Sequence, residues 1–179
     1  IAVYGHDPRI YQTTVKEFLK DKDESIIFYP HGSFMLGTTV RPYKEQRERN
    51  YDLDSICLFN KRKNETNPNE IRAQLKDLLE STEIYSSKLE TYERCITINY
   101  ADYGSLGFSI DAVPSAIATD DTKIQMMSEG CLPEYVNTAI EVAEVNKDKP
   151  NRWISSNPQA YVKWFEEINE PFASEYRSE

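Results

Sequence analysis

The chain has 179 residues, of which 39% are hydrophobic and 12% aromatic, and these values indicate one globular domain or one domain with part of a second. The mean hydropathy of −0.66 and the lack of a run of ~18 apolar residues exclude a membrane-spanning segment. The formal net charge is −9, of which −1 falls in residues 1–100 and −8 in residues 101–179. This acidic balance argues against tight nucleic-acid binding, because such binding depends on Lys and Arg that neutralise phosphates.

Cysteine usage and the N-terminus bear on the location of the protein. Cys57, Cys95 and Cys131 cannot all pair with one another, and none lies in a spacing typical of zinc sites. The first residues lack the basic stretch and apolar core of a signal peptide. We therefore expect a cytoplasmic protein and, because no initiator Met is present, a fragment or trimmed chain.

The first part of the chain predicts a helix, a strand and a long loop. Asp7 and Pro8 are typical of a helix start, and apolar residues then recur at helical spacing over residues 8–20. Residues 25–29 are a short apolar run that ends at a Gly-Ser turn, which predicts a strand. The polar residues 38–51 predict a loop.

A second strand and a second helix follow. Alternation over residues 52–59 predicts a strand, in which Asp52 and Asp54 share one face. Asn67 is a typical helix cap, and the apolar stripe behind it predicts a helix over residues 69–80.

The remaining elements are two or three strands and a final helix. Residues 95–100 and 106–113 predict an antiparallel hairpin, with Asp111 in its second strand. Residues 138–145 fit either a strand or a helix, and the alternation favours a strand. Asn157 opens a helix whose apolar side chains share one face: Tyr161, Trp164, Phe165 and Ile168. These elements together predict an α+β fold with a twisted, mostly antiparallel sheet and packed helices.

Three aspartates in strands point to metal chemistry. Asp52 and Asp54 project from one face a few ångströms apart, so their like charges repel unless a cation neutralises them. Carboxylate oxygens suit Mg²⁺, and Mn²⁺ could replace it. Asp111 supplies the extra ligand that a second ion would need for in-line phosphoryl transfer. Gly32-Ser33 alone is a weak signal, but upstream of these carboxylates it suggests a phosphate-binding loop.

The residues also resemble a known family. Gly-Ser followed by Asp-x-Asp and a later strand Asp is similar to the polymerase-β-type nucleotidyltransferases. The strings GSFMLGTTVRP, YDLDSICLF, FSIDAVPSAI and WISSNPQAYVKWF resemble more narrowly the bacterial cGAS/DncV-like nucleotidyltransferases (CD-NTases) of anti-phage signalling. The match runs from Tyr29 to Phe165 and implies a polymerase-β-like nucleotidyltransferase fold.

The resemblance implies a role for each site residue. Gly32 and Ser33 would contact the nucleoside triphosphate, and Asp52 and Asp54 would hold Mg²⁺. Asp111 would be a third ligand that helps to activate the attacking ribose hydroxyl.

Three neighbouring residues have open roles. Thr38 and Arg41 match the family string without an assigned contact, and a loop-fixing role fits both. His31 stands where relatives often carry Gln, and we expect a polar contact or a turn role rather than metal binding.

The resemblance also implies a domain division. Residues 1–150 would form the catalytic core, and residues 151–179 would begin a helical C-terminal lobe that is otherwise absent. The aromatic stripe after Asn157 is then either core packing or a surface that meets the missing part.

The leading hypothesis is an enzyme that joins nucleoside triphosphates into a cyclic oligonucleotide second messenger and releases pyrophosphate. A downstream effector protein would recognise the product. One alternative is a minimal nucleotidyltransferase that modifies a protein, RNA or small-molecule acceptor. Another is a catalytically inactive nucleotide-binding module.

Overall fold

The computed structural model describes residues 8–39, 43–44, 47–48, 51–103 and 106–177. Its first elements are α1 (Pro8–Lys22), β1 (Ile27–Pro30), α2 (Gly32–Met35), β2 (Tyr43–Lys44), β3 (Arg47–Glu48), β4 (Tyr51–Arg62), α3 (Pro68–Glu80) and α4 (Glu83–Ser86). They are followed by β5 (Leu89–Thr91), β6 (Ile96–Tyr103), β7 (Leu106–Ile117), α5 (Asp120–Ser128), α6 (Pro133–Val136), β8 (Ile140–Glu144), β9 (Arg152–Ser156) and α7 (Pro158–Arg177).

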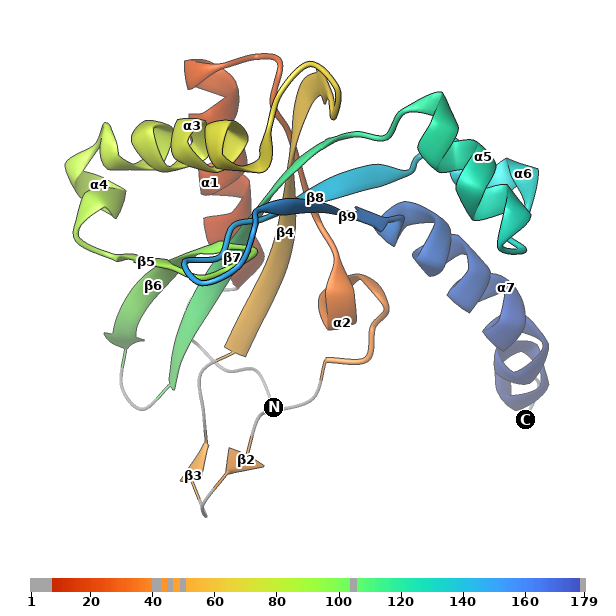
Figure 1. Cartoon of the computed structure of the whole chain (residues 1–179). Helices are drawn as coiled ribbons and strands as arrows, with labels where there is room; N and C mark the ends of the chain where they lie inside the picture. The colour runs from red at the N-terminus through yellow and green to blue at the C-terminus, as the bar shows by residue number, and fades with distance from the viewer. Residues whose placement is uncertain (1–7, 40–42, 45–46, 49–50, 104–105, 178–179) are drawn as a thin grey trace.

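One sheet of seven strands organises the molecule (Figure 1). Its main path runs β1-β4-β7-β6-β5, and β8 pairs with both β7 and β9. Strands β4 and β7 are parallel, while the other paired strands of the sheet are antiparallel. The predicted mixed fold with a mostly antiparallel sheet is therefore confirmed.

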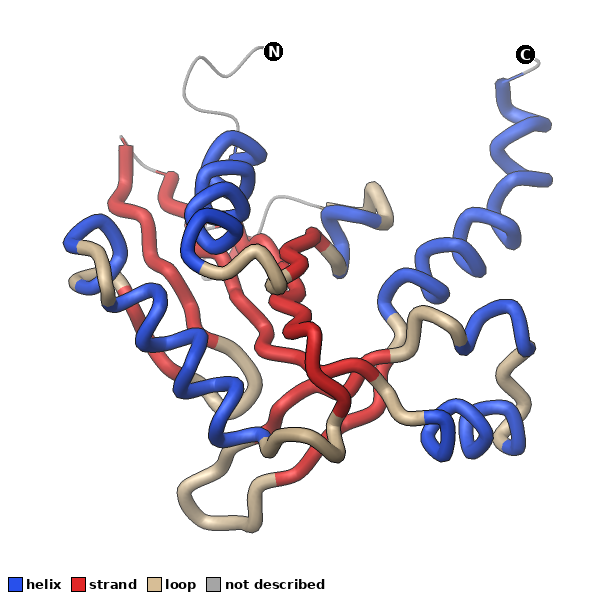
Figure 2. The backbone as a smooth tube through the Cα atoms, turned by 90° about the horizontal axis from the view of Figure 1, so that it is seen from above, coloured by secondary structure: helices blue, strands red, loops and turns tan. Residues whose placement is uncertain are grey.

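Helices α1 and α3 cover one face of the sheet (Figure 2). Leu53, Ile98 and Ile110 come from three neighbouring strands, and each is at most 2% exposed. They form one core cluster with the apolar stripes of the two helices. Because strand side chains alternate, the residues beside them, including the three aspartates, face away from this core.

The predicted helices are confirmed with small changes in length. Helix α1 continues to Lys22, two residues beyond its expected end. Helix α3 starts directly after Asn67, the residue predicted to cap it. The Asn67 side chain accepts a hydrogen bond from the Glu70 amide at 3.0 Å.

The segment that fitted either a strand or a helix is a strand, so the helical alternative is wrong. All five residues of β8 are buried, including the charged Glu141 and Glu144. Glu141 pairs with Lys63 at 2.7 Å, and Glu144 pairs with Arg94 and Arg152 at 2.6 Å. A strand buried on both faces loses clear alternation, which explains the ambiguous pattern.

Several elements differ from the predictions. The hairpin of β6 and β7 is present, but β6 continues through Tyr103 into the expected turn, whose residues 104–105 lie outside the described residues. The expected loop over residues 38–51 contains the short paired strands β2 and β3, and Arg41 lies outside the described residues. Helices α4, α5 and α6 and strand β9 were not predicted. Most of these elements are four or five residues long, too short for a clear periodicity.

Helix α7 begins after Asn157 as predicted, and it extends away from the sheet (Figures 1 and 2). Tyr161 is 52% exposed and Trp164 is 44% exposed, so the interpretation of this aromatic stripe as core packing is wrong. Its role as a contact surface for a further lobe stays a prediction, as does the domain boundary near residue 150.

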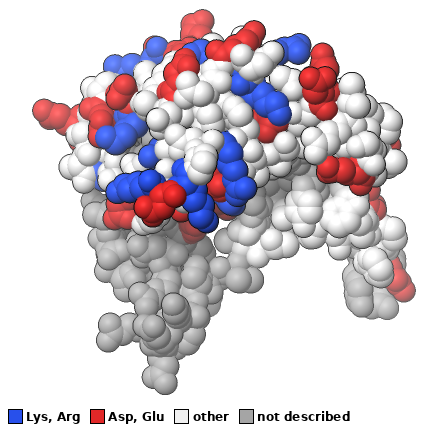
Figure 3. Space-filling view, viewed as in Figure 1, with Lys and Arg blue, Asp and Glu red and all other residues white. Residues whose placement is uncertain are grey.

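One face of the described surface carries mixed charge. On the face shown in Figure 3, Lys and Arg side chains lie among Asp and Glu side chains. Among the described helices, none is long and apolar enough to cross a bilayer.

The core beneath the aspartates gives a stability prediction. Ile110→Ala should lower the free energy of unfolding by about 2–5 kcal/mol, because it leaves a cavity beneath the sheet. Urea denaturation measures this loss. The matched control is Ile124→Ala on α5, where the side chain is 60% exposed and the change should stay within about 0.5 kcal/mol. Similar losses in both variants would contradict the assignment of this core.

Candidate active site

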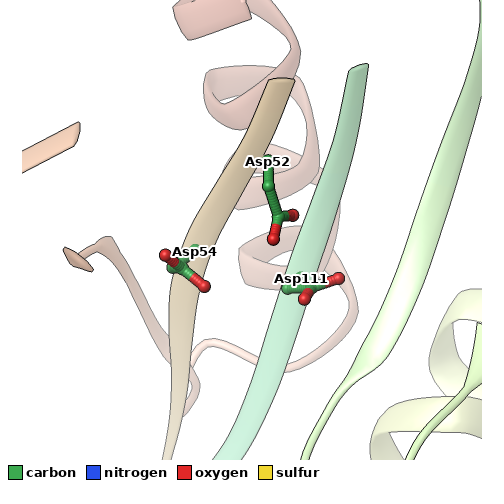
Figure 4. A group of neighbouring side chains, drawn as sticks. All are labelled: Asp52, Asp54 and Asp111. Carbon is green, nitrogen blue, oxygen red and sulfur yellow. The ribbon is translucent and has the colours of Figure 1, made fainter. Parts of the chain in front are cut away.

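The three aspartates converge from two neighbouring strands. Asp52 and Asp54 lie two residues apart on β4 and project from the same face. The parallel pairing of β4 with β7 sets Asp111 opposite Asp54. One carboxylate oxygen of each aspartate lies within 4.8 Å of the others, and Figure 4 shows the three side chains facing a shared space. This spacing can hold a metal ion.

Hydroxyl groups orient two of the carboxylates. Ser109 Oγ donates to Asp52 Oδ1 at 3.2 Å, and Thr97 Oγ1 donates to Asp111 Oδ1 at 2.5 Å. The strand register explains both contacts, because Ser109 lies opposite Asp52 and Thr97 lies opposite Asp111. The buried carboxylates of β8, in contrast, have Lys and Arg partners.

Burial and mutual repulsion disfavour the charged forms. Burial, then the charges of Asp111 and Asp54, raise the pKa of Asp52 to about 6, although the hydrogen bond from Ser109 opposes the shift. Burial and the Asp111 charge also raise the pKa of Asp54. A cation bound between these groups would relieve both effects.

Gly32 lies directly against the cluster. Its φ of +66° is the left-handed conformation that favours glycine. A Cβ at this position would lie 2.3 Å from Asp54 Oδ2, which is closer than atoms can approach. The absence of a side chain at Gly32 therefore leaves the space that the Asp54 carboxylate occupies.

Ser33 follows in the short helix α2, where the sequence predicted a turn that contacts the nucleotide. Its side chain is exposed, and Thr39 Oγ1 lies 3.4 Å from Ser33 Oγ. The Thr38 amide donates to the Ser33 carbonyl at 3.0 Å. This contact fits the loop-fixing role expected of Thr38.

His31 connects the turn to β4. Its amide donates to the Asp54 carbonyl at 3.0 Å. Burial lowers the pKa of its imidazole, although the Asp111 charge opposes this shift. Its Nε2 is buried and finds no hydrogen-bond partner within the described part of the chain. The carboxylate cluster consists of Asp52, Asp54 and Asp111, and the expectation that His31 does not bind the metal stays a prediction.

A cavity of about 330 Å³ lies beside this turn. It is lined from the turn by His31, Gly32 and Leu36, and from the start of α7 by Ser156, Asn157, Pro158, Tyr161 and Val162. No pattern in the sequence indicated that these two segments lie side by side. Thr97 and Ser109 were also missed, because strand hydroxyls are common and only the register singles out these two.

Comparisons with known proteins identify a matching family model and a curated relative. Residues 27–114 match the family model described as cyclic GMP-AMP synthase DncV-like, nucleotidyltransferase domain. A c-di-GMP synthase of Roseivirga ehrenbergii is 27% identical over 159 residues, which are 86% of this chain and 36% of that protein.

Solved structures share the fold. Bradyrhizobium diazoefficiens CdnG, in complex with GTP, has a TM-score of 0.61 at 23% identity over 88% of this chain and 40% of its own. Elizabethkingia meningoseptica CdnE, a cyclic dinucleotide synthase with GTP and Apcpp, has a TM-score of 0.58 at 16% identity. The match covers 87% of this chain and 49% of the CdnE chain. A mutant of Vibrio cholerae DncV has a TM-score of 0.53 at 18% identity, and the match covers 82% of this chain and 37% of the DncV chain.

The chain therefore spans less than half the length of each of these relatives. The family match nevertheless includes Gly32, Ser33 and all three aspartates. The resemblance found in the sequence is therefore confirmed over residues 27–114, which match the nucleotidyltransferase domain of the DncV-like type.

Proposed function

We propose that this protein is a Mg²⁺-dependent nucleotidyltransferase that joins nucleoside triphosphates into a cyclic oligonucleotide and releases pyrophosphate. The observation that carries the proposal is the convergence of Asp52, Asp54 and Asp111 beside the Gly32 turn. An anti-phage signalling role, a cytoplasmic location and an effector protein that recognises the product complete the proposal.

The donor set fits divalent metal ions. Three carboxylates offer hard oxygen ligands of the kind that Mg²⁺ and Mn²⁺ accept. When bound, two ions would neutralise the attacking and leaving oxygens of an in-line displacement. Asp52 and Asp54 would hold these ions, and the repulsion between the carboxylates favours their binding.

The remaining site residues would handle the nucleotide. Backbone amides at Gly32 and Ser33, with the Ser33 hydroxyl, would bind the triphosphate. Asp111 would help to activate the ribose hydroxyl, whose oxygen attacks the α-phosphorus. A new phosphorus–oxygen bond then forms, the bond to the bridging oxygen breaks, and pyrophosphate leaves.

The cavity beside Gly32 supports a nucleotide substrate, because it is lined by His31 and Gly32, and Gly32 in turn lies against the Asp54 carboxylate. The bound GTP of CdnG and the GTP and Apcpp of CdnE support triphosphate substrates for the present protein as well.

Transfer to another acceptor and a catalytically inactive module are less favoured. All three carboxylates are present, and the relative from Roseivirga ehrenbergii is a c-di-GMP synthase. Incubation with mixed nucleoside triphosphates and Mg²⁺ separates the hypotheses. A soluble oligonucleotide would support the proposed synthase, a labelled acceptor would support transfer to another acceptor, and no product would support the inactive module.

The double substitution Asp52→Asn and Asp54→Asn tests the metal centre. We expect product formation to fall at least about 10³-fold, because the charge that develops in the transition state loses its stabilisation. Mass spectrometry of the soluble products measures the loss. Asp77→Asn, an exposed carboxylate on α3, is the matched control and should keep full activity. Turnover of the double variant within a few-fold of the parent would remove the metal assignment.

The raised pKa of Asp52 predicts a pH-dependent stability. A pKa of about 6 in the folded state means that folding favours the protonated form, so the metal-free chain should lose stability as the pH rises from about 4 to 6. Asp52→Asn keeps an acceptor for Ser109 without the charge. At pH 7.5 it should raise the Tm of the metal-free chain by about 2–4 °C.

Thermal unfolding with EDTA and with Mg²⁺ measures this effect. Mg²⁺ should raise the Tm of the parent and have a smaller effect on Asp52→Asn. A lower Tm for Asp52→Asn in EDTA at pH 7.5 would contradict the repulsion.

Gly32→Ala tests the close contact between the turn and Asp54. The added Cβ would displace the Asp54 carboxylate, so we expect Mn²⁺ affinity to fall about tenfold or more. Gly37→Ala is a matched control, because Gly37 has the same φ of +66° but nothing within 4 Å of an added Cβ. Both variants should lose similar stability from backbone strain, and only Gly32→Ala should lose metal affinity. Equal metal affinity in both would show that Gly32 has no steric role at the centre.

A further inference from the structure

Thr97 is a buried hydroxyl residue beside the carboxylate cluster. It lies on β6, opposite Asp111 on β7, and is 6% exposed. Its Oγ1 donates to Asp111 Oδ1 at 2.5 Å. Asp111 on β7 lies opposite Asp54 on β4 on one side and opposite Thr97 on the other. The three residues therefore form one row across three neighbouring strands.

The direction of this hydrogen bond is fixed by chemistry. A hydroxyl has one proton, and Thr97 Oγ1 donates it to the carboxylate oxygen of Asp111. Cys95 Sγ lies 3.9 Å from Thr97 Oγ1. Since the threonine proton is already used, the thiol can act only as the weak donor in that contact.

The backbone around Thr97 holds the hydroxyl in place. Ile96 and Ile98, on either side of it in the sequence, are fully buried in the core on the opposite face. The β-branched side chain of threonine also has few rotamers. The Thr97 hydroxyl can therefore fix the plane of the Asp111 carboxylate before any ion binds.

We propose that Thr97 is a positioning residue of the metal centre, which orients Asp111 through Oδ1 so that the carboxylate faces Asp52 and Asp54. The inference rests on the proposed function, because it assumes that these carboxylates bind a divalent metal ion. Hydrogen-bond partners of metal ligands typically contribute about 10–100-fold to metal affinity. Thr97 is the stronger candidate of the two hydroxyls, because the hydrogen bond of Ser109 to Asp52 is longer, at 3.2 Å, and exposed.

The test measures Mn²⁺ binding to the 179-residue chain by electron paramagnetic resonance, without nucleotide. Thr97→Val keeps the shape of the side chain and removes the hydroxyl, and we expect its Kd for Mn²⁺ to rise about 10–100-fold. Thr97→Ser restores the hydroxyl and should keep the Kd within about threefold of the parent. If Thr97→Val does not fold, Thr97→Ala replaces it with the same expectation.

The matched control is Thr122→Val on α5. Thr122 is 4% exposed and donates to Glu141 at 2.7 Å, so this change also removes a buried hydroxyl from a carboxylate, but away from the cluster. It should lower the Tm and leave the Kd for Mn²⁺ unchanged. This control separates a positioning role from a loss of stability.

The outcomes distinguish the two proposals. An unchanged Kd in Thr97→Val, with Mn²⁺ bound by the parent and lost in Asp52→Asn/Asp54→Asn, overturns the role of Thr97 alone. A parent chain that binds no Mn²⁺ overturns the metal centre and with it the role of Thr97. Equal losses of affinity in Thr97→Val and Thr122→Val also overturn the positioning role.

Discussion

The parallel pairing of β4 with β7 is the constraint on which the site depends. It sets Asp111 opposite Asp54, although the two lie far apart in the sequence. A shift by one residue would turn Asp111 into the core and bring an apolar residue to the site, because strand side chains alternate. Leu53 on β4 and Ile110 on β7 are buried on the opposite face of the sheet, and a shift would expose such a side chain. The core thus fixes the register, and the register forms the cluster.

The cluster has a cost in stability when no cation is bound. Burial and like charges raise the pKa of Asp52 to about 6 and also raise that of Asp54. Elsewhere in the sheet, buried Glu141 and Glu144 have Lys or Arg partners. Among the described residues, Asp52 and Asp111 instead accept hydrogen bonds from hydroxyls, which orient a carboxylate but do not neutralise it. Carboxylates that cluster without a cationic partner in the described part of the chain are typical of a site that binds a cation.

Each aspartate has its own structural support. Ser109 and Thr97 orient Asp52 and Asp111 through hydrogen bonds, and Gly32 leaves room for Asp54. The Gly-Ser turn thus has a second role besides the phosphate contact proposed for it. It limits where Asp54 can lie, so the turn and the metal centre are coupled by contact. The same turn lines the cavity that reaches α7, where the exposed aromatic stripe begins.

Local patterns in the sequence determined several secondary-structure elements and the candidate site residues of this protein. The Asn67 cap and apolar stripe predicted α3, alternation predicted β4, and the motif strings indicated the family and its three aspartates. The sequence favoured a strand for β8 without excluding a helix, and it could not reveal the Thr97 contact or the fit of Gly32 against Asp54. Those features depend on strand pairing and burial between distant segments. Side-chain periodicity is set by the local backbone, whereas the partner of each strand and its register are decided only when the whole sheet packs.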